Sequence, residues 1–107
     1  MTTFDEREQA YEAKFAHDEE LRFKAVARRD RRFGAWVAKQ LGLTGARAED
    51  YTVKVVRADL AHPGDKAIIE TVLTDLKSQG LATDEQKLKV KLIDLMEEAL
   101  AELEAGK

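Results

Sequence analysis

The first 33 residues contain neither glycine nor proline, and this absence constrains the fold more than any other feature of the chain. Nothing in this stretch interrupts an α-helix, and its many Glu, Lys, Arg and Ala residues favour one. The charge changes sign halfway along it. Residues 1–20 carry seven acids and two bases, whereas residues 21–40 carry seven bases and one acid, Asp30. We therefore expect a long, polar first helix with an acidic beginning and a basic end.

Break signals divide the rest of the chain into further helices. Gly42 and Gly80 are placed to cap helix ends, with Leu43 and Leu81 folding back on the last turns. His62-Pro63-Gly64 interrupts the chain because the residue before proline avoids the helical region. Short loops favour antiparallel neighbours, so the expected fold is all-α, a four-helix bundle. Its helices should cover about residues 5–41, 47–61, 65–80 and 83–103.

Apolar residues recur at helical spacing in each segment and predict the core. Asp65 is expected to cap the third helix, and Thr83 with Gln86 has the spacing of a capping box for the fourth. Tyr51, Val53 and Val55 also alternate as a strand would, but a lone strand would have no partner. Gly34 weakens the first helix. The expected core residues are Phe33, Trp36, Val37 and Leu41; Val53, Val56 and Leu60, flanked by Tyr51 and Val55; Ile68, Ile69, Val72, Leu73 and Leu76; and Leu88, Leu92, Leu95, Met96, Ala99 and Leu103, with Val90, Ile93 and Leu100 widening this last face.

The expected first helix is too long for the bundle. A helix over residues 4–41 would measure about 57 Å, whereas the fourth helix would measure about 33 Å. Roughly the first 15 to 20 residues should then project from the bundle, or be disordered until bound. The sequence therefore divides into a mobile segment, residues 1–18, and a four-helix body, residues 19–107.

The acidic beginning carries a narrow aromatic stripe. Phe4, Tyr11 and Phe15 fall within about 40° of one another on a helical wheel. Such a pattern is typical of a segment that folds into a groove on a partner, with aromatic anchors and orienting charges. The alternative, that the three rings cap the end of the bundle, remains open.

Composition excludes several functions. The net charge of −3 argues against general binding to nucleic acid or anionic membranes. No apolar run approaches the roughly 20 residues that span a bilayer, and the N-terminus does not resemble a signal peptide. The chain has no cysteine for disulfides or thiolate metal sites. His17 and His62 have no ligand at zinc-like spacing, and no glycine-rich phosphate loop precedes a helix. We expect no enzyme activity, metal or cofactor.

The basic cluster from Arg28 to Arg32 allows one competing interpretation. With Trp36 as a stacking platform, it could contact nucleic acid. Helical geometry scatters these arginines around the axis, however, and Trp36 lies on an apolar face. The alternative is a solvated face, paired in part with the acidic fourth helix, whose acids are Glu97, Glu98, Glu102 and Glu104.

Several runs of residues are distinctive enough to indicate a family. With them, the whole chain resembles the zeta subunit of alphaproteobacterial F-type ATP synthase. Asp30 stands where this family would lead us to expect asparagine, and Phe33-Gly34-Ala35 replaces a more leucine-rich run. The matching runs are Phe4-Asp5-Glu6-Arg7-Glu8, Tyr11-Glu12-Ala13-Lys14-Phe15-Ala16-His17-Asp18-Glu19-Glu20-Leu21, Phe23-Lys24, Ala27-Arg28-Arg29, Trp36-Val37-Ala38 and Leu41-Gly42-Leu43.

The resemblance implies an inhibitor of ATP hydrolysis. Its N-terminal helix would insert between catalytic subunits of the synthase head (alpha, beta and gamma subunits) near the rotor, while the body stays outside. This implies a cytoplasmic protein without membrane insertion, expected to be a monomer when free. The alternative is a helical adaptor without inhibitory activity. His17 would make binding pH-sensitive or be an exposed spectator. The implied partner-binding residues are Phe4, Tyr11 and Phe15 as anchors, Arg7, Glu8, Glu12 and Lys14 as polar contacts, and His17, Asp18 and Glu19.

Overall fold

The computed structural model describes residues 18–106, and residues 1–17 and 107 lie outside this description. All regular secondary structure within the described range is helical, which confirms the all-α prediction. The strand considered for residues 51–55 is absent there, and this stretch is helical. The four helices are α2 (Glu19–Gln40), α3 (Gly45–Ala61), α4 (Asp65–Ser78) and α5 (Glu85–Glu104).

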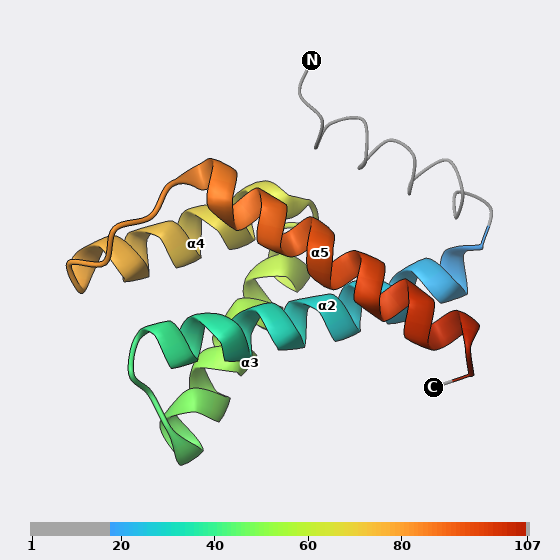
Figure 1. The fold of residues 1–107 in the computed structure, drawn as a ribbon, viewed down its shortest axis with the longest axis horizontal. Helices are drawn as coiled ribbons and strands as arrows, with labels where there is room; N and C mark the ends of the chain where they lie inside the picture. Colours follow the sequence, from blue (N-terminus) through green and yellow to red (C-terminus); the bar gives the residue numbers. More distant parts are fainter. Residues whose placement is uncertain (1–17, 107) are drawn as a thin grey trace.

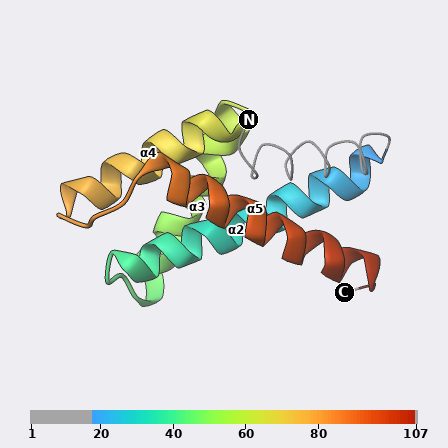
Figure 2. The same ribbon diagram turned by 45° about the horizontal axis from the view of Figure 1, so that its top comes forward.

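Helix α2 is the central element of the four-helix body. It packs mainly against α3 on one flank and α5 on another, while α4 packs against α3 and α5 (Figure 1). The last turns of α5 lie beside the first turns of α2, as the second view also shows (Figure 2). The expected four-helix body is thus confirmed over the described residues.

Most of the predicted core positions are buried. Phe33 and Val37 of α2 are fully buried in one large cluster with residues of the other three helices. Trp36, predicted to be core, is half-buried at the edge of this cluster. Burial of these apolar side chains is the main force that holds the four helices together. The buried residues of α4 and α5 are Ile68, Ile69, Val72 and Leu76, and Leu88, Leu92, Ile93, Leu95, Ala99 and Leu100.

The predicted inner face of α3 is wrong in part. Its buried residues are Tyr51, Thr52 and Val55, whereas Leu60 is 67% exposed. The reason lies in Gly34, because a Cβ there would come within 2.9 Å of Thr52 Cα. The backbones of α2 and α3 therefore approach closely at this point, which turns the Thr52 side of α3 inward. The buried Thr52 hydroxyl donates a hydrogen bond to the Ala48 carbonyl at 2.9 Å, so its burial leaves no donor unpaired.

Both predicted glycine caps are confirmed. The N–H of Leu43 donates to the Ala38 carbonyl at 2.9 Å, and that of Leu81 donates to the Leu76 carbonyl at 3.0 Å. Gly42 and Gly80 have φ of 76° and 74°, the left-handed conformation that this type of helix end requires.

The predicted helix starts are wrong at two places. The N-cap of α4 is Gly64, so Asp65 is the first helical residue and not the cap. Asp84 caps α5 in place of Thr83, because its Oδ1 accepts the Lys87 N–H at 2.9 Å. Helix α2 begins at Glu19 after the Asp18 cap, whose φ of −115° and ψ of 81° are not helical, and residues 5–17 of the predicted first helix lie outside the described residues. Each correct start places a short acid or a glycine where the helix N–H groups are unpaired.

Candidate functional site

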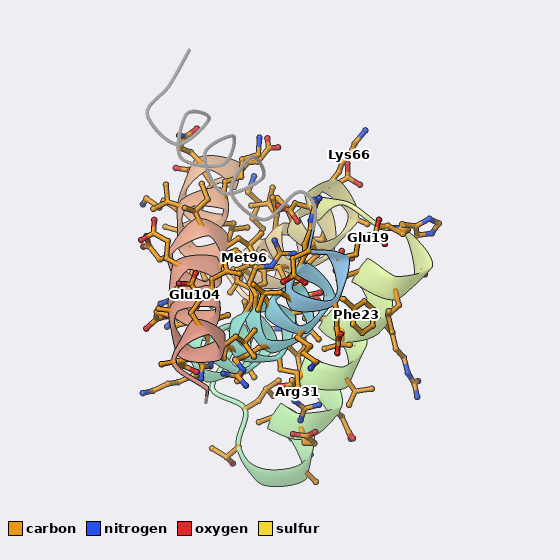
Figure 3. All side chains as sticks on the ribbon, turned by 90° about the vertical axis from the view of Figure 1, so that its right-hand side faces the viewer. Glu19, Phe23, Arg31, Lys66, Met96 and Glu104 are labelled. Atoms are coloured by element: carbon orange, nitrogen blue, oxygen red, sulfur yellow. The ribbon has the colours of Figure 1, made fainter. Side chains whose placement is uncertain are left out.

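The structure describes two of the ten predicted partner-binding residues, Asp18 and Glu19. Asp18 is the N-cap of α2 and Glu19 is its first residue, and both are exposed. Figure 3 labels Glu19 at this end of the body. The other eight lie outside the described residues: Phe4, Arg7, Glu8, Tyr11, Glu12, Lys14, Phe15 and His17.

Asp18 marks the point where the described body begins. Its Oδ1 accepts the Leu21 N–H at 2.9 Å, and its carbonyl accepts the Arg22 N–H at 3.0 Å. Glu19 and Glu20 follow in the first turn, where a negative charge interacts favourably with the helix dipole. This end of α2 is therefore defined by its own capping group.

The first turns of α2 are anchored to the end of α5. Leu21 and the buried Ala25 pack with Ala99, Leu100 and Leu103 in a second, smaller apolar cluster. Met96 joins this cluster from α5 and lies between the two helices in Figure 3. The junction at Asp18 is thus attached to a packed part of the body.

Another face of α2 near this end exposes an aromatic ring. Phe23 is 69% exposed, and Figure 3 shows it beside the N-terminal part of α2. A single exposed aromatic residue is common on protein surfaces. Phe23 therefore provides a point for comparison with the predicted aromatic anchors, but it does not define a binding site.

The basic run of α2 is largely used within the body. Arg28 and Arg32 both reach Glu102 of α5, at 2.9 Å and 2.6 Å. The hydrogen bond from Arg32 lowers the pKa of Glu102, and the same bond raises the pKa of Arg32. The predicted pairing with the acidic fourth helix is confirmed at Glu102. Arg31 pairs with Glu49 of α3 at 3.1 Å.

Arg29 faces the end of α3 and the start of α4, and it is buried. Its Nε and Nη2 both donate to Asp30 Oδ1, at 3.1 Å and 3.0 Å, and Nη2 also donates to Asp65 Oδ1 at 2.9 Å. Asp59 Oδ2 lies 4.0 Å from the same nitrogen. Burial alone would lower the pKa of Arg29, but the three carboxylates outweigh it and raise this pKa. The sequence reasoning missed this cluster, although Asp30 as the one acid in a basic run was a signal for it.

Trp36 does not offer a free stacking platform. Its ring stacks on Phe33 with the centroids 6.1 Å apart, and Lys91 Nζ lies 5.2 Å from the Trp36 centroid. Trp36, Leu81 and Lys91 line a shallow cleft between α2, α5 and the loop before α5. With the arginines paired as well, the described residues lack the combined basic and aromatic surface that the nucleic-acid interpretation needs.

Residues 18–106 bring together no group of three or more His, Asp or Glu side chains suited to a metal ion. None of the helices in this range combines the length and apolar character needed to cross a lipid bilayer.

Comparison with known proteins supplies the family. A search among curated proteins found no significant match. A family model, described as ATPase inhibitor subunit zeta, matches residues 1–102 of the 107. This match spans the Asp18 junction and includes the acidic segment before it as well as nearly all of the helical body. The chain therefore belongs to the ATPase inhibitor subunit zeta family.

Proposed function

We propose that this protein is a non-catalytic regulator that blocks ATP hydrolysis by F-type ATP synthase. Residues 1–18 are the inhibitory segment, and they insert as a helix between catalytic subunits near the rotor. Residues 19–107 form the body, which stays outside the catalytic head and holds the segment in place.

The observation that carries this proposal is the family match, which begins at residue 1 and so includes the acidic, aromatic segment. The Asp18 cap supports the division, because its Oδ1 accepts the Leu21 N–H and so caps the start of α2. The internal pairing of Arg28, Arg29, Arg31 and Arg32 also supports it, because these charges already have acidic partners in the body.

The direct test measures ATP hydrolysis by the cognate synthase head. The full chain and a peptide of residues 1–18 should both suppress hydrolysis, the peptide at higher concentration because it must order on binding. A chain that lacks residues 1–17 should fold normally and leave hydrolysis unchanged. Full hydrolysis in the presence of saturating full-length protein would end the proposal.

The aromatic anchors allow a sharper test. Phe15→Ala should weaken inhibition by at least tenfold, about the effect of losing one well-buried anchor, without changing the melting temperature. Phe23→Ala is the matched control, because it removes the same ring from an exposed position of the body. A large fall in melting temperature for Phe15→Ala would assign this ring to the end of the bundle instead.

The adaptor alternative makes a different prediction. An adaptor without inhibitory activity would still bind the synthase after residues 1–17 are removed, and its full-length form would not slow hydrolysis. Binding can be measured by co-sedimentation with the synthase head while hydrolysis is followed in the same samples. Loss of both binding and inhibition on truncation would exclude the adaptor.

A further inference from the structure

Three helices contribute to a cluster of four charged side chains, two of which are buried. Arg29 and Asp30 come from α2, Asp59 from the last turn of α3 and Asp65 from the first turn of α4. Arg29 is 7% exposed and Asp30 is 3% exposed. The cluster therefore lies between α2 and the corner where α3 ends and α4 begins, the stretch interrupted by Pro63.

The charges of this cluster do not balance. The Asp65 side chain is 35% accessible and can be solvated, whereas those of Asp30 and Asp59 are only 4% and 11% accessible. Two ionised carboxylates beside one guanidinium would leave one net negative charge where there is little access to water. Such charge is costly unless it is paired or removed by protonation. Arg29 cannot relieve it by changing its own charge, since a guanidinium stays protonated. A carboxyl group is the member of the cluster that can take up a proton.

The hydrogen bonds indicate where that proton lies. Asp30 Oδ1 accepts both bonds from Arg29, which leaves Oδ2 for another partner. Asp59 Oδ2 lies 4.0 Å from Arg29 Nη2, and this neighbouring carboxylate also raises the pKa of Asp30. Two ionised carboxylates beside one guanidinium repel each other, and one proton on the pair removes that repulsion. The cluster thus favours one proton on the Asp30–Asp59 pair.

The groups around Asp30 shift its pKa in both directions. Burial and the neighbouring Asp59 raise its pKa to about 8, whereas Arg29 opposes this rise. Asp65 of α4 acts on Arg29 and so competes with Asp30 for the guanidinium. Among the described residues, no charged group of α5 contributes to the shift at either Asp30 or Arg29.

We propose that Arg29, Asp30, Asp59 and Asp65 form a proton-dependent latch that holds the α3–α4 corner against α2. With one proton on the Asp30–Asp59 pair, the latch is closed. When that proton is lost, Asp30 and Asp59 repel each other, and the corner opens from α2 while the rest of the body stays folded. This property is independent of how residues 1–18 act on a partner.

The direction of the pH dependence follows from the proton count. The pKa of Asp30 rises from 3.8 to about 8 on folding, so the folded chain keeps a proton that the unfolded chain releases. The stabilisation is complete below pH 3.8, declines as the pH rises, and is lost at about pH 8. The latch should therefore open on the alkaline side of neutrality.

The full-length protein provides the test, by carbon-detected NMR of its carboxyl groups between pH 5 and 10. The Asp30 signal should shift with a midpoint near pH 8. Amide exchange near the corner, at residues 58–62 and 64–66, should show about tenfold more opening at pH 9 than at pH 6 after correction for intrinsic exchange, the factor that one pKa unit represents. An Asp30 midpoint below pH 5 would overturn the proposal without any variant.

Asp30→Asn provides the matched variant. The amide oxygen can accept from Arg29 and the amide nitrogen can donate to Asp59, so asparagine imitates the protonated acid. The variant should remove the extra opening at pH 9 and leave exchange at pH 6 unchanged, and Asp59→Asn should do the same. Asp50→Asn, at an exposed position of α3, is the control and should keep the wild-type pH dependence. An unchanged pH dependence in Asp30→Asn would contradict the latch.

Discussion

The two flanks of α2 show how differently neighbouring arginines can act. Arg28 and Arg32 form ion pairs with Glu102 at a partly exposed surface, where their side chains are 28% and 39% accessible. Arg29, between them in sequence, is buried and faces three acids at the flank toward α3 and α4. Solvent screens the first group, so it contributes little to stability, whereas the second group depends on its pairing. Burial, and not the number of contacts, separates the two flanks.

The largest effect is expected when the buried flank loses its cation. Arg29→Ala leaves Asp30, Asp59 and Asp65 without their shared partner and should reduce the free energy of unfolding by about 3–5 kcal/mol. Urea denaturation measures this loss. Arg32→Ala is the control from the exposed flank and should cost much less. Equal losses for the two variants would show that burial does not distinguish the flanks.

A somewhat smaller loss of stability is expected from a substitution at Gly34 that pushes α3 away from α2. Gly34→Ala adds a Cβ that would lie 2.9 Å from Thr52 Cα, a backbone atom that cannot move alone. Helix α3 must then shift from α2, at a cost of about 1–3 kcal/mol, although alanine is the better helix former. Urea denaturation gives the change, and NMR shifts should move at Asp59 more than at Glu102. A more stable variant would contradict the close approach.

The exposed flank should respond weakly, and with the opposite pH dependence. Glu102→Gln removes both ion pairs and should lower the melting temperature slightly, less so in high salt. The pKa of Glu102 is lowered from 4.5, so its stabilisation is present above pH 4.5 and is lost as the pH falls through the lowered value. Thermal melts between pH 2 and 7 should therefore show a weaker acid decline in Glu102→Gln than in the wild type. The same decline in both proteins would exclude this role.

The smallest change in stability is expected at Phe23, which belongs neither to the Arg29 cluster nor to the ion pairs of Glu102. Phe23→Ser should change the free energy of unfolding by no more than about 0.5 kcal/mol, because the ring is 69% exposed. Chemical denaturation measures the change. A loss of several kcal/mol would show that this face of α2 is packed.

Local sequence signals predicted much of this fold. Gly42 and Gly80 need a left-handed conformation, and the apolar spacing of α4 and α5 leaves one possible inner face, so these predictions were confirmed. The face of α3 was not predictable in the same way, because it depends on how closely two backbones approach at Gly34. Apolar periodicity alone puts Leu60 on the inner face of α3, so Leu60 was wrongly predicted to be core.

The charged clusters show the same limit. Pairing between the basic part of α2 and the acidic α5 followed from charge patterning, and Glu102 confirms it. Asp30, Asp59 and Asp65 are separated in sequence, and their meeting depends on the turn between α3 and α4. The partner-binding role of Asp18 and Glu19, and of the residues before them, stays a prediction. Their assignment comes from family resemblance and from the aromatic spacing, and the fold of residues 18–106 does not bear on it.

The Asp18 cap has a consequence for how this chain can change over evolution. In an uninterrupted helix, inserting one residue would rotate everything before it by about 100° relative to everything after it. A cap with non-helical dihedral angles ends that dependence, since α2 starts from Asp18 whatever precedes it. Insertions or deletions upstream of Asp18 are therefore free to alter the length and facing of the N-terminal segment without changing the register of the four helices. The two parts of the chain can vary as separate modules, although no flexible linker divides them in the sequence.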